Sequence, residues 1–236
     1  MSLPEGARDY KEAFERIEAA VDSGNTDLRE LGFWRLLAKV KADPVLSHHW
    51  AEEAGRIDRK AFEARVRLRF PVWFGNAVLL VGTFVASFAV VLALSTTSEL
   101  TAGLALLFAG GAWSVSLHSP AHWLTGRVAG IRFTSYFFGG PFPPRPGLKT
   151  DYATYLRADP AARAWMHASG AIATKLAPFA ALAFWPATEA PAWTAWALIA
   201  LGLLLIGTDV AFSVRSSDWK KVRRELRVAR VQASNR

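Results

Sequence analysis

Four long apolar segments constrain this chain more than any other feature of its sequence. They run over residues 72–95, 100–124, 166–186 and 192–214. Each is long enough to cross the hydrocarbon core of a bilayer, which needs about twenty residues at 1.5 Å of helix rise per residue. Hydrophobic residues make up 52% of the 236 residues. The sequence therefore predicts an all-α integral membrane protein with about four transmembrane helices.

The basic residues of the loops predict how these spans are oriented. Lys and Arg are frequent in residues 56–69, before the first span, in residues 127–163, and in residues 215–224, after the last span. The two remaining loops, 95–99 and 187–191, contain neither. The positive-inside rule then places both termini in the cytoplasm. The net charge of +8 fits this topology and contact with anionic lipids, and its dispersal argues against nucleic-acid binding.

The segments outside the spans predict three further parts. Residues 1–70 form a cytoplasmic helical region, with helices expected over 8–23, 26–42 and 47–70. Within the membrane core of residues 71–215, the aromatic and proline-rich loop 128–164 is expected to lie at the membrane interface. Residues 216–236 form a basic cytoplasmic tail, whose Trp219, Val222, Leu226 and Ala229 follow the spacing of an amphipathic helix on the inner leaflet.

Two histidines near the end of the second span suggest a metal site. His118 and His122 are four residues apart, so on a helix both imidazoles lie on one face and can reach one ion. In the His-Glu-x-x-His motif of zinc proteases the Glu is the general base, but here Ser119 takes its position. Pro120 is expected to bend the helix beside the pair. A plainer alternative is that both rings are neutral and hydrogen-bonded to neighbouring carbonyls.

Three stretches resemble the site-2 protease family of intramembrane zinc metalloproteases, in a degenerate form. The first is His118-x-x-x-His122, followed by Gly126-Arg127-x-x-Gly130-Ile131. The second is residues 168–174, similar to the family's Gly-Pro-x-x-Asn element but with Ala171 and Thr174 in place of Pro and Asn. The third is Thr208-Asp209, where the family supplies its third zinc ligand. The likeness covers roughly residues 100–215.

The resemblance implies a zinc site and a surface for membrane segments. Zinc would be held by His118, His122 and Asp209, which all lie roughly 8–14 Å inside the cytoplasmic boundary at 1.5 Å per residue. Substrate or partner contacts would fall on Gly170 and Thr174, and on Gly139 and Gly140. These two glycines belong to the loop that in the family borders the path of the substrate helix.

Lys175, in the third span, needs a partner or access to water. An ion pair with Asp209 would remove the third ligand, but the two residues lie roughly 9 Å apart along the membrane normal. We therefore expect Lys175 to snorkel or to face a water-filled cavity. A serine hydrolase built on Ser119 is disfavoured, because no strand-turn-helix elbow exposes that side chain.

These features predict a weakly active or inactive site-2-protease-like protein that binds membrane segments or partner proteins. Its partners would be membrane lipids and a transmembrane helix or another membrane protein. A structural or accessory subunit of a larger complex, without metal, is the alternative. A third possibility is an active metallohydrolase in which Lys175 substitutes for the missing base.

Overall fold

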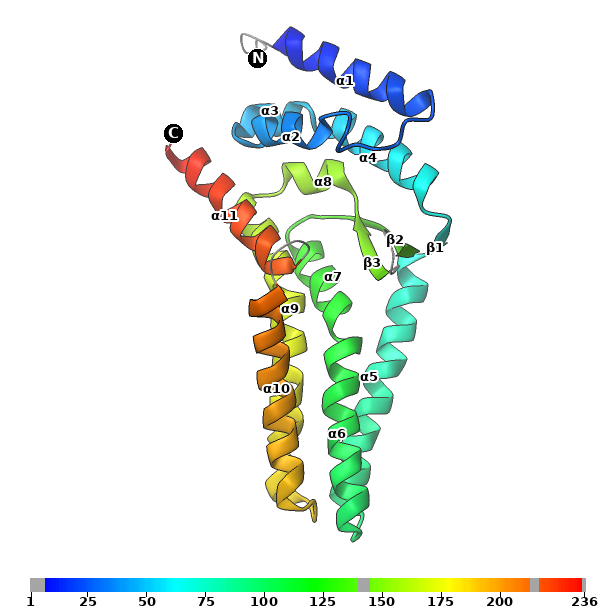
Figure 1. Ribbon diagram of the computed structural model, residues 1–236, viewed down its shortest axis with the longest axis vertical. Helices are drawn as coiled ribbons and strands as arrows, with labels where there is room; N and C mark the ends of the chain where they lie inside the picture. Colours follow the sequence, from blue (N-terminus) through cyan, green and yellow to red (C-terminus); the bar gives the residue numbers. More distant parts are fainter. Residues whose placement is uncertain (1–6, 140–144, 213–216, 235–236) are drawn as a thin grey trace. The chain divides into compact units, whose positions relative to one another are not determined.

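In the computed structural model, the chain is described over residues 7–139, 145–212 and 217–234 and is mostly helical (Figure 1). It divides into two compact units. Unit 1 comprises Met1–Val72, Arg127–Ala162 and Leu226–Arg236, and unit 2 comprises Trp73–Gly126 and Arg163–Glu225. Each unit thus joins segments that are distant in the sequence, and most of the loop 128–164 belongs to unit 1.

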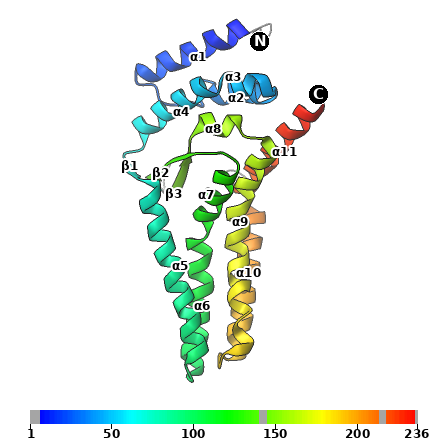
Figure 2. The ribbon, with the colours of Figure 1, turned by 180° about the vertical axis from the view of Figure 1, so that it is seen from behind.

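Unit 2 is built from long apolar helices. They are α5 (Val72–Ser95), α6 (Glu99–Ser116), the first part of α7 (His118–Val128), α9 (Pro160–Leu182) and α10 (Ala192–Phe212). Seen from both sides, α5 lies beside α6 and α9 beside α10 (Figures 1 and 2). The hydroxyls of Thr83 of α5 and Ser116 of α6 are hydrogen-bonded at 3.0 Å, with Ser116 as the donor, because Thr83 donates to the Leu79 carbonyl of its own helix at 3.0 Å. This bond satisfies two polar groups that would otherwise face an apolar environment.

Glycines let the helices of unit 2 approach one another closely. A Cβ atom on Gly110 of α6 would lie 2.9 Å from Leu198 Cδ2 of α10, and one on Gly202 of α10 would lie 2.4 Å from Phe179 Cζ of α9. Small residues at such contacts are typical of helix packing in membranes.

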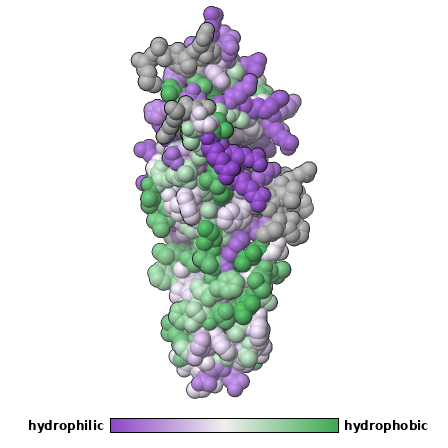
Figure 3. Space-filling model, turned by 90° about the vertical axis from the view of Figure 1, so that its left-hand side faces the viewer, coloured by the Kyte–Doolittle hydropathy of each residue, from purple (hydrophilic) through white to green (hydrophobic). Residues whose placement is uncertain are grey.

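Within the described residues, three helices are long and apolar enough to cross a membrane, and a bent pair makes a fourth if it counts as one span. The three are Val72–Ser95, Pro160–Ala187 and Ala192–Asp209; the pair is α6 with α7, bent by 42°. Hydrophobic side chains cover much of the surface of these helices on the face shown in Figure 3. Because a water-soluble protein rarely exposes so continuous an apolar surface, this supports association with a membrane.

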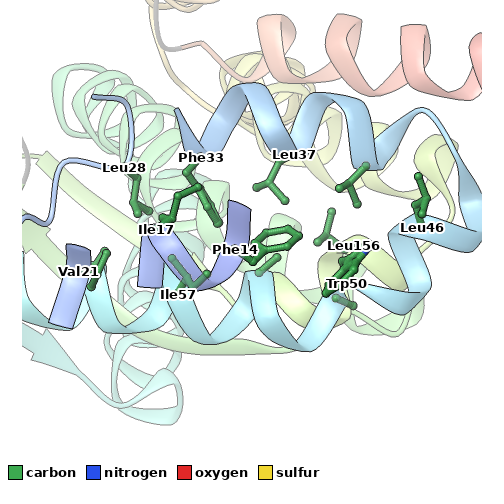
Figure 4. Close-up of a cluster of buried hydrophobic side chains, with 14 residues drawn as sticks. Phe14, Ile17, Val21, Leu28, Phe33, Leu37, Leu46, Trp50, Ile57 and Leu156 are labelled. Carbon is green, nitrogen blue, oxygen red and sulfur yellow. The ribbon is translucent and has the colours of Figure 1, made fainter. Parts of the chain in front are cut away.

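Unit 1 contains a cluster of short helices around its own core. The helices are α1 (Ala7–Asp22), α2 (Phe33–Lys41), α3 (Pro44–His49), α4 (Ala51–Arg65) and α8 (Tyr152–Arg157). Phe14, Phe33, Leu37, Ile57 and Leu156 are buried at its centre (Figure 4). The expected helix 8–23 is confirmed. The expected helices 26–42 and 47–70 are too long, since α2 begins only at Phe33 and a break at Trp50 separates α3 from α4.

A small antiparallel sheet completes unit 1. It consists of β1 (Leu68–Phe70), β2 (Phe133–Gly139) and β3 (Arg145–Thr150), in the order β1-β2-β3. The expectation of a helical end at residues 68–70 was wrong, since these residues form β1, and part of the loop 128–164 forms β2 and β3. That this loop lies at the membrane interface stays a prediction. Aromatic residues favour strands, and Gly147 makes room for the ring of Phe137, whose Cζ would lie 2.5 Å from an added Cβ.

The C-terminal segment forms helix α11 (Asp218–Ser234). In the part belonging to unit 2, its buried face carries Val222 and Glu225, with Val222 packed against Ala164 and Ala168 of α9. The predicted helix is confirmed, and of its predicted apolar residues Val222 is buried and Leu226 is exposed. Contact of this helix with the inner leaflet stays a prediction. The helix packs on protein through a face that mixes apolar and acidic side chains.

Candidate metal centre

The bend between α6 and α7 positions the two histidines. Pro120 has no N–H, so it cannot bond to the carbonyl of Ser116 four residues before, and the helix breaks at Leu117. The bend of 42° begins one residue before His118. The expected kink beside the histidine pair is thus confirmed. Because of this bend, α7 runs in a different direction from α6, and His118 and His122 lie on one face of α7.

His118 and His122 converge with a carboxylate that the sequence analysis did not select. The Oδ2 atom of Asp218, the first residue of α11, lies 3.5 Å from His118 Nε2 and 3.3 Å from His122 Nε2. The three residues offer ligand atoms within 4.8 Å of one another. The side chains of His122 and Asp218 are 11% and 16% exposed, whereas that of His118 is 38% exposed, so the group is open to water on the side of His118.

The second nitrogen of each ring is held by a hydrogen bond. His122 Nδ1 lies 2.5 Å from the Met166 carbonyl oxygen, which can only accept, so Nδ1 carries the proton. His118 Nδ1 lies 2.9 Å from the Thr174 hydroxyl, which itself donates to the Ser114 carbonyl at 3.1 Å. The hydroxyl hydrogen is thereby used, so His118 Nδ1 is also the donor. In both neutral rings the lone pair is then on Nε2, facing Asp218.

Three acceptor atoms therefore face one another, and such a group is complementary to a cation. The cation can be a metal ion or a proton on one imidazole. Ligands at about 2.0–2.2 Å from a tetrahedral zinc ion lie roughly 3.3–3.6 Å apart, and the two nitrogen–oxygen separations of 3.5 and 3.3 Å fall in this range. Metal-binding histidines also donate their other N–H to a carbonyl or similar acceptor. The donor set thus fits a divalent transition metal.

Asp218 is held in place through helix α11. Arg163 of α9 lies 2.8 Å from Glu225 of α11, and both side chains are almost completely buried. Breaking such a pair is costly, because it leaves an uncompensated buried charge. Lys221 Nζ donates a hydrogen bond to Oδ1, the other carboxylate oxygen of Asp218, at 3.0 Å. This arrangement leaves Oδ2 for the histidines.

The surroundings of Asp218 also keep it ionised. Burial acts to raise the pKa of Asp218, but the His122 ring in its protonated form, which donates to the carboxylate, and the Lys221 ammonium outweigh burial. The net pKa lies well below the usual range of an aspartate. The carboxylate is thus in the form that binds a cation.

Asp209, the expected third ligand, lies elsewhere. Its Oδ2 atom pairs with Lys175 Nζ at 2.5 Å, and Lys175 also donates to the Ala171 carbonyl at 3.0 Å. The structure therefore contains the ion pair that we had considered unfavourable, in place of a snorkelling lysine. The separation of roughly 9 Å along the membrane normal assumes straight, parallel spans. Among the described residues, the group that could hold a metal contains Asp218 and not Asp209.

The residues predicted to contact a substrate or partner lie in different parts of the structure. Gly170 faces the ring of His122, since an added Cβ would lie 2.3 Å from His122 Nε2, and Thr174 orients His118. Both therefore border the metal centre. Gly139 ends β2 in unit 1, where it pairs with Arg145 of β3, and Gly140 lies outside the described residues.

A signal for Asp218 was present in the sequence. Asp218, Val222 and Glu225 are spaced i, i+4 and i+7 in an otherwise strongly basic segment, so the two acids share a helix face with an apolar residue. A polar surface helix would not concentrate its acids there.

The whole chain was also compared with known proteins: no family model, curated protein or solved structure matches it.

Proposed function

We propose that this chain is a four-span integral membrane protein with both termini in the cytoplasm and a zinc site formed by His118 and His122 of the second span and Asp218 of the C-terminal helix. It is site-2-protease-like in its histidine motif but lacks the general base. Its activity is to bind membrane segments or partner proteins, with proteolysis weak or absent.

One observation carries the proposal: two imidazole nitrogens and one carboxylate oxygen converge with separations of 3.3 and 3.5 Å, and each ring is held from behind. Ionisable side chains are costly inside a membrane and usually act in function. The span count follows from treating α6 and α7 as one bent span, and the orientation follows from the basic loops.

Neither Ser119 nor Lys175 supplies a base for hydrolysis. Zinc, when bound, would supply Lewis acidity toward a water or a carbonyl. Ser119 stands where a zinc protease has its Glu, and a hydroxyl does not accept a proton at neutral pH. Lys175 is an ammonium paired with Asp209, so it has no lone pair to offer. Loss of general-base help typically costs about 10²–10⁴ in rate.

The alternative is a structural or accessory subunit without metal. The pair of Lys175 with Asp209 supports it in one respect, since this ion pair lies among the apolar helices of unit 2 and is not part of the candidate metal centre. In that case the histidines and Asp218 would share a proton.

Metal content distinguishes the two functions. The protein would be purified in detergent without chelators and its zinc measured by elemental mass spectrometry, beside His122→Ala and a matched control, His48→Ala, at an exposed position of unit 1. We expect near-stoichiometric zinc in the native chain and in the control, and its loss from His122→Ala. If the native chain contains no zinc, the proposed zinc site is wrong, and a structural or accessory subunit remains as the function.

A further inference from the structure

Helix α11 carries a row of basic side chains that the metal centre does not use. Lys220, Arg223, Arg227 and Arg230 are all exposed. Successive members of this basic row are three, four and three residues apart, so the four side chains lie on one face of the helix. At 1.5 Å of rise per residue, the row extends over about 15 Å.

The opposite face of α11 is covered by protein. Asp218 belongs to the metal centre, Val222 packs against α9, and Glu225 pairs with Arg163 of α9 at 2.8 Å. Successive residues of an α-helix are rotated by about 100°, so this buried face and the basic row lie on opposite sides of the helix. The buried Val222 is therefore not available for a membrane, and α11 faces outward with its basic row.

The acidic residues of α11 do not neutralise this row. Residues 217–234 contain six basic and two acidic side chains. The two acidic side chains pair with Lys221 at 3.0 Å and with Arg224 at 3.2 Å, and neither of these basic residues belongs to the row. The three arginines of the row form no ion pair with the residues that the structure describes. Like charges at these spacings destabilise a helix, and an anionic partner removes that cost.

The chain keeps α11 close to the end of the last span. Helix α10 ends at Phe212 and α11 begins at Asp218, so six residue steps of at most about 3.6 Å each join them. The orientation proposed above places this end of α10 at the cytoplasmic leaflet, which contains anionic phospholipids. This step rests on that orientation. The basic row then lies within reach of lipid headgroups.

We propose that the basic row of α11 binds the phosphate groups of anionic phospholipids. A guanidinium group can donate two parallel N–H bonds to one phosphate, and three of the four residues of the row are arginines. A zwitterionic headgroup carries a cation of its own, which the row repels, so the row favours anionic over zwitterionic lipids. Single-stranded nucleic acid fits less well, because the row contains no aromatic side chain on which a base can stack.

Native mass spectrometry of the full chain in a non-ionic detergent tests this proposal. Phosphatidylglycerol and phosphatidylcholine are titrated separately, and the apparent Kd of the first bound lipid is measured. The row variant replaces the three arginines of the row: Arg223→Gln, Arg227→Gln and Arg230→Gln. The matched control removes three positive charges at exposed positions of unit 1: Arg29→Gln, Arg35→Gln and Lys39→Gln.

We expect phosphatidylglycerol to bind the native chain and the control with the same affinity, and to bind the row variant at least about tenfold more weakly. A basic residue at an anionic leaflet contributes about fivefold to binding, so three account for about 100-fold. Other basic segments of the chain also attract the lipid, and about tenfold is the smallest loss that supports the proposal. Phosphatidylcholine should bind all three proteins weakly.

Three outcomes would overturn the proposal. Phosphatidylglycerol binds the row variant as tightly as the native chain; phosphatidylcholine binds the native chain as tightly as phosphatidylglycerol does; or a short single-stranded RNA binds the native chain more tightly than either lipid and loses affinity in the row variant. Circular dichroism checks that each variant folds. If the row variant does not fold, the single charge reversal Arg227→Glu decides, with Arg35→Glu as its control. Zinc takes no part in this measurement, so its result is separate from that of the metal analysis.

Discussion

Replacing Asp218 by asparagine is the sharpest test of which aspartate belongs to the metal centre. The change keeps the shape of the side chain and removes its negative charge. Structural zinc sites with four protein ligands bind with about 10–16 kcal/mol, so each ligand contributes about 2.5–4 kcal/mol if they share it equally. Asp218 is one of three protein ligands within 4.8 Å. We therefore expect Asp218→Asn to weaken zinc binding by about 10²–10³-fold.

The assay is competition with a chromogenic zinc chelator on detergent-purified protein. Asp209→Asn is the matched control, because it makes the same chemical change at the position that pairs with Lys175. It should leave zinc affinity close to that of the native chain and lower the melting temperature, since the lysine loses its partner. If Asp218→Asn binds zinc normally while Asp209→Asn does not, our assignment of the third ligand is wrong.

Three further changes probe the surroundings of the centre and the core of unit 1. Thr174→Val should lower zinc affinity about 10–100-fold in the same assay while Thr174→Ser retains it, because only the hydroxyl orients the first histidine. Gly170→Ala should lower stability by about 1–3 kcal/mol and abolish zinc binding, because the new Cβ would overlap the His122 ring; melting and metal content measure this. The hydrogen bond from Arg56 outweighs burial and lowers the pKa of Glu18 from 4.5 to about 2. A lowered pKa stabilises the fold above pH 4.5 and ceases to do so as pH falls toward 2, so Glu18→Gln should melt below the native chain at pH 6 and alike near pH 2. A difference that does not change with pH would contradict this last expectation.

Much of the helical architecture could be predicted from the apolar segments. The span expected at 72–95 has the bounds of α5, and the segments expected at 166–186 and 192–214 contain most of α9 and α10. Such helices are set locally, since a lipid environment requires every backbone group to bond within its own segment. The sheet could not be predicted in the same way. β1 and β2 are more than sixty residues apart, and their pairing depends on contacts that no local pattern records.

The candidate metal centre shows where local reasoning ends. Helical spacing was sufficient to bring His118 and His122 together, because residues four positions apart lie on the same face of α7. The third ligand had to come from another helix, and depth alone allowed Asp209. The deciding factor is Lys175: in a medium of low dielectric, an ammonium takes the nearest carboxylate, so Asp209 is neutralised by the pair at 2.5 Å. Asp218 remains for the histidines because the buried pair of Arg163 with Glu225 holds α11 against α9. The ion-pair partner of a charged residue inside a span must therefore be identified first. Only then can an acidic residue at the same depth be assigned as a metal ligand.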